Sequence, residues 1–102
     1  MERTAQEHIN QLREEIDRID AELIALFERR MDTARAIGCI KLENSMDIKN
    51  ESREQQVKEN CRKNCKNKLY TAGAEAVMMG IINECRNIQQ ADPPREDVPA
   101  KA

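Results

Sequence analysis

The stretch "LFERRMDTARAIGCIK", residues 26–41, decides the fold because it continues a seven-residue apolar repeat and places a charged residue within it. One heptad position holds Ile9, Ile16, Leu23 and Ile37, and a second holds Leu12, Ile19, Leu26 and Ile40. The first series places Arg30 where an apolar residue is expected. Such a repeat is typical of helices that pack along other helices, so it predicts a long amphipathic helix with a guanidinium in its seam.

The expected limits of this helix are incompatible with a compact single chain. Thr4 and Glu7 have the spacing of a capping box, and the seam then continues to Ile40 without a proline, with Gly38 as its one weak point. A helix over about residues 5–42 is roughly 57 Å long, whereas a compact chain of this size is about 33 Å across. Because little other material is available to cover the seam, we expect an oligomer.

Two shorter helices are expected after the apolar pattern breaks over residues 43–47. The second helix is predicted over about 49–66 and the third over about 72–90. The proline-rich segment 91–102 has no apolar pattern, and we expect a disordered tail there. The sequence therefore predicts an all-α fold of three helices in one domain over residues 1–90.

The shorter helices have thinner apolar faces. On the second, a series with four-residue spacing begins at a guanidinium and consists of Arg53, Val57, Cys61, Cys65 and Leu69. On the third, the expected apolar face consists of Ala74, Val77, Met78, Ile81, Cys85 and Ile88. Gln89 follows one turn after Cys85, at the edge of that face. Suitable N-caps for the second helix are Asp47, Asn50 and Ser52.

Composition narrows the class of protein. The 102 residues include one Phe, one Tyr and no Trp, so the core must be aliphatic and rich in methionine. Charged residues make up 35% and the net charge is −2, which gives no attraction to nucleic acid or an anionic membrane surface. No apolar run approaches the roughly 18 residues of a membrane span, and the N-terminal residues have no apolar signal-peptide core. We expect a cytoplasmic protein.

Four cysteines, at positions 39, 61, 65 and 85, allow disulfides, a metal site or free thiols. A reducing compartment favours free thiols. Cys61 and Cys65 are one helical turn apart, which differs from the usual zinc-binding pairs, and the single histidine, His8, is remote in sequence. We therefore expect no metal.

Polar residues on the apolar faces are the strongest functional signal. Arg30 and Lys41 are 11 residues apart and project within about 20° of each other, while Arg53 and Gln89 lie on the other helices. Each long side chain alone is readily explained by snorkelling. Together the cations exceed the nearby carboxylates, of which Glu54 is the best candidate, and a small polyanion would balance them. Such a site suits either charge stabilisation without acid–base catalysis or binding without reaction.

The segments "LREEIDRIDAELIALFERRMDTARAIGCIK", "REQQV" and "IINECRNIQ" resemble the all-helical chorismate mutases. The resemblance extends over residues 9–90. It implies three helices per chain in an intertwined homodimer, with the long first helices packed against each other. It also implies the Claisen rearrangement of chorismate to prephenate, without a cofactor or a covalent intermediate.

The resemblance assigns the main catalytic roles. Arg30 matches the family arginine that binds a substrate carboxylate, and Arg13 matches one that reaches in from the other subunit. Lys41 and Gln89 match the pair that donate hydrogen bonds to the ether oxygen, where negative charge develops in the transition state.

Further matches concern substrate binding. Glu54 matches the residue that accepts a hydrogen bond from the ring hydroxyl, and Arg53 matches its neighbour at the rim of the site. Asn50 stands where some relatives have Asp, and Cys85 where some have Ser, which replaces a good hydrogen-bond donor with a poor one. Both departures affect substrate binding more than the chemistry at the ether oxygen.

Two alternative functions remain from the sequence. A lyase of the same fold that removes pyruvate from isochorismate would use a similar set of side chains, although Arg53 and Glu54 in "KNESREQQ" look more like the mutases. The second alternative is a non-catalytic helical dimer that senses metabolites. Lys41 and Gln89 argue against it, because binding alone does not need donors at the ether oxygen.

Overall fold

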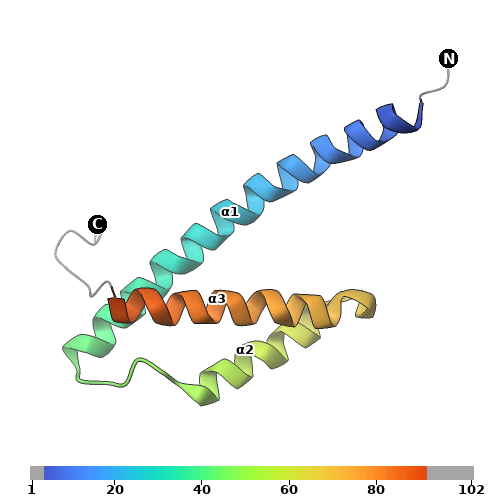
Figure 1. Ribbon diagram of the computed structural model, residues 1–102. Coiled ribbons are helices and arrows are strands. Elements are labelled where there is room, and N and C mark those ends of the chain that lie inside the picture. Colours follow the sequence, from blue (N-terminus) through green and yellow to red (C-terminus); the bar gives the residue numbers. More distant parts are fainter. Residues whose placement is uncertain (1–3, 92–102) are drawn as a thin grey trace. The chain divides into compact units, whose positions relative to one another are not determined.

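The computed structural model describes residues 4–91, which form three α-helices and a short 3-10 helix without a strand (Figure 1). In chain order these are α1 (Ala5–Glu43), α2 (Glu51–Asn64), η1 (Lys68–Tyr70) and α3 (Thr71–Ala91). The prediction of a three-helix all-α chain is confirmed. The chain divides after Asp32 into two compact units, and α1 contributes to both. The tail expected over 91–102 lies outside the described residues beyond Ala91.

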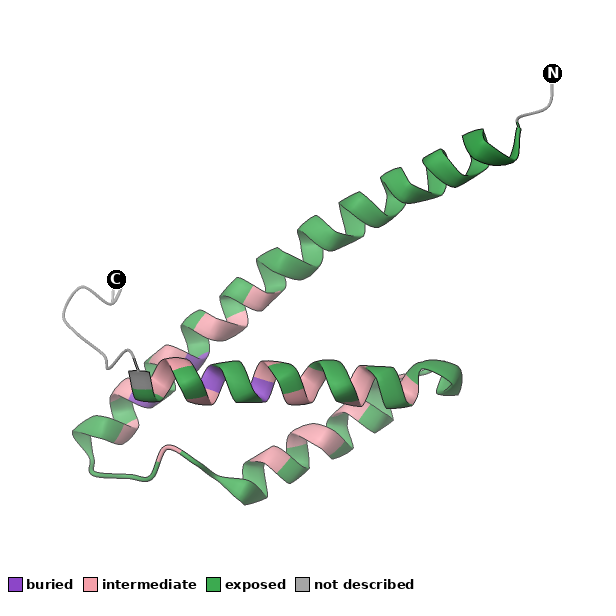
Figure 2. Ribbon diagram, in the orientation of Figure 1, coloured by how far each residue is buried: buried purple, intermediate pink, exposed green. Residues whose placement is uncertain are grey.

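The start of α1 has the predicted capping box. The backbone N–H of Thr4 donates to Oε1 of Glu7 at 2.8 Å, and the N–H of Glu7 donates to Oγ1 of Thr4 at 3.1 Å. Every described residue as far as position 26 is exposed, including the apolar seam (Figure 2). The helix of the first unit is therefore set by its cap and its sequence, without a packed face inside that unit.

The end of α1 is a Schellman motif. Ser45 has a left-handed φ of 55°, the N–H of Met46 donates to the carbonyl of Lys41 at 2.8 Å, and the N–H of Ser45 donates to that of Leu42 at 3.3 Å. This is the 6→1 and 5→2 pattern that satisfies terminal carbonyls, with Ser at the position where Gly is usual. The motif directs the chain into the loop that leads to α2.

Helix α2 is shorter than the predicted 49–66. Asn50 is its N-cap, and its side-chain oxygen accepts from the N–H of Arg53 at 3.0 Å. At the other end, Nζ of Lys68 donates to the carbonyls of Arg62 and Cys65, both at 3.1 Å. A cation at a helix C-terminus is favourable because it meets unpaired carbonyl groups.

The packed face of α2 differs from the predicted one. The half-buried residues at helical spacing are Glu54, Val57, Lys58 and Cys61. Arg53 is exposed, with Nη1 donating to Oε1 of Gln56 at 2.6 Å, and Leu69 is 82% exposed in η1. The expectation that Arg53 lies on the apolar face was wrong, because this face of α2 begins one residue later, at Glu54.

Helix α3 packs along α2 within the second unit. The buried residues there include Ala34 on α1 and Ile82 and Cys85 on α3 (Figure 2). The prediction that Cys85 faces the core is confirmed. The prediction for Val77 was wrong, because it is 61% exposed. Ile82 is not on the predicted apolar face, yet it is only 6% exposed. The step of five positions from Val77 to Ile82 turns the helix by about 140°, so the two cannot share a face.

All four cysteines are free thiols. Partial burial raises the pKa of the Cys39 thiol, and the carboxylate of Glu43, which accepts from it at 3.7 Å, raises it further. Residues 4–91 contain no cluster of three or more metal-binding side chains. Within the same range, no helix combines the length and apolar character needed to cross a membrane.

Candidate active site

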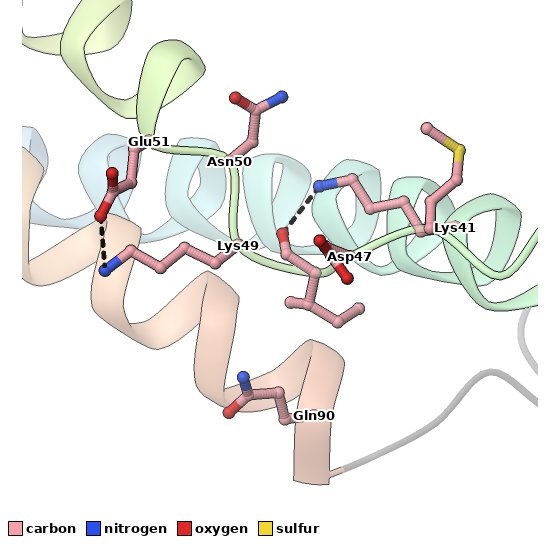
Figure 3. Close-up of a pocket in the computed structure, with 8 residues that line it drawn as sticks. Lys41, Asp47, Lys49, Asn50, Glu51 and Gln90 are labelled. Atoms are coloured by element: carbon pink, nitrogen blue, oxygen red, sulfur yellow. Dashed lines mark hydrogen bonds and ion pairs between the residues drawn. The ribbon is translucent and has the colours of Figure 1, made fainter.

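Lys41 is held at both ends by the loop that follows α1. Its backbone carbonyl accepts from the N–H of Met46 at 2.8 Å as part of the Schellman motif. Its side chain is half-buried, and Nζ donates to the backbone carbonyl of Ile48 at 2.8 Å (Figure 3). An ammonium has three N–H donors, so this bond fixes its position and uses only one of them.

An open pocket of about 800 Å³ lies beside this ammonium. It is lined by Lys41, Met46, Asp47, Ile48, Lys49, Asn50, Glu51 and Gln90 (Figure 3). Lys49 forms an ion pair with Glu51 at 3.6 Å, so its charge is already compensated by a neighbour. Lys41 has a carbonyl rather than a carboxylate at its ammonium, which leaves the charge available for a negatively charged ligand.

Gln89 contacts α1 rather than lining this pocket. Its side chain is half-buried, and Nε2 donates to the backbone carbonyl of Ala34 at 2.5 Å. The amide nitrogen carries two hydrogens, and this bond uses one. Lys41 and Gln89 are therefore both hydrogen-bond donors that backbone carbonyls hold in place.

Glu54 pairs with a cation that the sequence analysis did not single out. Nη2 of Arg86 donates to Oε2 of Glu54 at 2.7 Å, and the two side chains are 25% and 19% exposed. The Nε of Arg86 is buried and has no hydrogen-bond partner among the described residues. Its position in the sequence could have indicated this role, because Arg86 lies one turn before Gln89 on the predicted third helix.

The remaining predicted site residues have diverse surroundings. Asn50 lines the pocket, but its side-chain oxygen is engaged as the cap of α2. Cys85 is buried in α3, and Arg53 is exposed. Arg13 and Arg30 belong to the first unit, where Arg13 is exposed and Arg30 is half-buried. The second unit thus contains Lys41, Glu54 and Gln89, on one helix each.

This set of side chains suits charge stabilisation better than proton transfer. It offers an ammonium and an amide as donors and one carboxylate with an arginine partner. Donors that are already oriented can stabilise developing negative charge without rearranging during the reaction. The arrangement therefore suits a ligand that is negatively charged or that gains negative charge.

Comparison with known proteins identifies the family. The family model for chorismate mutase type II matches residues 12–90. The chain is also similar to proteins named intracellular chorismate mutase from Mycobacterium bovis and Mycobacterium tuberculosis, with 45% identity over 49 residues, or 48% of this chain and 47% of each relative. It thus spans about half the length of the curated relatives it matches, and no solved structure matches it. The chain belongs to the chorismate mutase type II family.

Proposed function

We propose that this protein is a cytoplasmic chorismate mutase that converts chorismate to prephenate in the synthesis of phenylalanine and tyrosine. The observation that carries the proposal is the pair of half-buried donors, Nζ of Lys41 and Nε2 of Gln89, each held by a backbone carbonyl in a chain of this family. The reaction is a unimolecular rearrangement, so it needs a correctly folded substrate and stabilised charge rather than a nucleophile or a cofactor.

Lys41 and Gln89 act on the ether oxygen. As the C–O bond breaks, negative charge develops on this oxygen, and the ammonium and the amide each donate a hydrogen bond to it. Both interactions strengthen in the transition state, which is the condition for raising kcat rather than only binding substrate. Glu54 accepts a hydrogen bond from the ring hydroxyl, with Arg86 holding the carboxylate in place, and Arg53 lies at the rim.

The substrate carboxylates require the arginines of the first unit. Arg30 binds one carboxylate, and Arg13 of a second subunit binds the other. Arg13 and Arg30 are 17 residues apart, or about 25 Å along one helix, too far for both to bind one small substrate from one chain. An antiparallel partner helix brings its own Arg13 near Arg30. We therefore propose an intertwined homodimer with composite active sites, in which the exposed seam of α1 is the interface.

Two side chains weaken substrate binding relative to the family pattern. The oxygen of Asn50 is used by the N–H of Arg53, which leaves only its amide nitrogen for a substrate contact. Cys85 is buried and offers a weak S–H donor where some relatives have a hydroxyl. We expect these differences to affect KM more than kcat.

The direct test measures the loss of chorismate by the purified full chain, with isochorismate as a parallel substrate. Prephenate formed from chorismate supports the proposal. Pyruvate released from isochorismate alone would instead identify a lyase, and no turnover of either would favour a metabolite-binding protein.

The mechanistic test compares two lysines of the same pocket. Lys41→Ala is expected to lower kcat by about 10²–10³, the usual effect of removing one donor to developing negative charge. Lys49→Ala is the matched control, because Lys49 lines the pocket but is paired with Glu51. If Lys41→Ala retained more than half of the wild-type kcat, Lys41 would have no place in the mechanism.

A further inference from the structure

Gly38 has the side chain of Gln89 in the place where its own side chain would be. A Cβ built on Gly38 would lie 2.8 Å from Cγ of Gln89, 3.3 Å from its Cβ and 3.4 Å from its Cδ. The first distance is shorter than real Cβ atoms show, and it involves the middle of the Gln89 side chain rather than its flexible end. The absence of a side chain at position 38 therefore makes room for Gln89.

Backbone conformation gives no other reason for a glycine here. Gly38 lies inside α1, is buried, and has no positive φ. Glycine is the poorest helix former after proline, so its presence in a helix interior is unfavourable unless it serves packing. Gly73 and Gly80 of α3 differ, because a Cβ at either would meet nothing within 4 Å.

The space at Gly38 also gives access to a helical carbonyl. In an α-helix the carbonyl of one residue points toward the residue four positions later, so the carbonyl of Ala34 lies beside residue 38. Nε2 of Gln89 donates to this carbonyl at 2.5 Å. Ala34 is itself small and 8% exposed. Ala34 and Gly38 thus form a notch in α1 that receives the Gln89 side chain and fixes its amide.

We infer that Gly38 is a positioning residue for Gln89. It does not touch the substrate; it permits the packing and the hydrogen bond that orient the second N–H of the amide. Its effect on the reaction rests on the proposed role of Gln89 at the ether oxygen. Its effect on packing does not depend on that role.

The test is Gly38→Ala, with Gly80→Ala as the matched control. The added methyl group at position 38 displaces Gln89, so kcat is expected to fall at least tenfold while KM changes less. Gly80→Ala adds the same methyl group in open space, so kcat should be unchanged and Tm should rise. A Gly38→Ala protein with a kcat within twofold of wild type would overturn the inference.

Combining Gly38→Ala with Gln89→Ala shows whether Gly38 acts through Gln89 or whether its substitution disturbs the fold in general. Gln89→Ala removes Cγ and the amide but keeps Cβ, so in this background Gly38→Ala should have no further effect on kcat and should be less destabilising, measured as Tm, than in the wild-type background. An equal loss of kcat in both backgrounds would show that Gly38 does not act through Gln89. If the chain had no mutase activity, the proposed function would fail, while the Tm comparison in the two backgrounds would still test the packing.

Discussion

The two units of the chain differ in what their apolar side chains meet. In the first, every described residue as far as position 26 is exposed, including Leu12 at 65% and Leu23 at 57%. In the second, α2 packs along α3, and Ala34, Ile82 and Cys85 are buried. Helices in water are stabilised mainly by packing of an apolar face, so the second unit supplies its own packing and the first does not.

This difference favours a second copy of the chain as the partner of the first unit. The exposed seam residues are Ile9, Leu12, Ile16, Ile19, Leu23 and Leu26. Each isoleucine or leucine that is fully buried contributes about 1.5–3 kcal/mol. Their seven-residue repeat matches the geometry of a helix packed on a helix, and the same repeat on another copy is complementary to it.

The largest expected effect is that of a charge in this seam. Leu23→Asp places a carboxylate in the proposed dimer interface twice per dimer, so we expect loss of the dimer and most of the helix of the first unit. Activity should fall below detection because the composite sites are lost. Analytical ultracentrifugation and circular dichroism measure the two structural changes.

Ala21→Asp is the matched control for this substitution. Position 21 is exposed and lies about 200° around the helix from position 23, on the side away from the seam. The same carboxylate should therefore leave the dimer intact. If both variants remained dimeric and active, the seam would not be the interface.

The next effect tests whether the two units of different subunits share one site. Arg13→Ala and Lys41→Ala homodimers should each be nearly inactive. Co-expression forms mixed dimers in which one site carries both changes and the other carries neither. With random pairing, half of the dimers are mixed and each has one intact site, so activity should return to about a quarter of wild type, measured as prephenate formation.

The control mixes the two proteins after separate purification. If the subunits are intertwined, exchange requires unfolding, and activity should return slowly or not at all. Mixed dimers that were verified by mass and were as inactive as their parents would show that Arg13 does not act across the interface, because each site would then take Arg13 and Lys41 from the same subunit.

The limits of α1 were the more predictable part of the fold from sequence. A capping box and a seven-residue repeat are local signals, and both depend on residues within one helix. They gave the start of α1 at Ala5 and its end within one residue of Glu43. The cap at Asn50 was one of three predicted candidates, because Asp47, Asn50 and Ser52 have similar capping chemistry.

Contacts between helices were less predictable. Arg86 lies on the third helix and its partner Glu54 on the second, so neither residue's own helix reveals the pair. Gly38 was identified only as a weak point of the helix, since the space that it provides is filled by Gln89, 51 residues later. Such features depend on the rotation of each helix about its axis. For α2 the predicted packed face began at Arg53, one residue before its true start at Glu54.

A smaller effect tests how far the second unit depends on its pairs between α2 and α3. Arg86→Met leaves the carboxylate of Glu54 half-buried without its partner, so we expect a loss of about 1–3 kcal/mol in the free energy of unfolding, measured in urea. Arg62→Met is the control. Arg62 also pairs with a carboxylate of α3, Glu75, but its side chain is 51% exposed, and exposed pairs contribute about 0–1 kcal/mol. If the two variants lost the same free energy of unfolding, the pair of Glu54 and Arg86 would contribute no more than an exposed pair.

The smallest expected effect concerns the end of α1, which the second unit stabilises locally through backbone hydrogen bonds. Ser45 adopts φ 55°, which disfavours a residue with a Cβ by about 1–2 kcal/mol, whereas glycine adopts it freely. Glycine also has more freedom in the unfolded chain, which offsets part of the gain. Ser45→Gly should therefore raise the free energy of unfolding by about 0.5–1 kcal/mol. Ser52→Gly, in the first turn of α2, should lower it by a similar amount. Opposite signs in urea unfolding would support the left-handed turn that places Lys41 beside the carbonyl of Ile48; a loss of stability in both variants would contradict it.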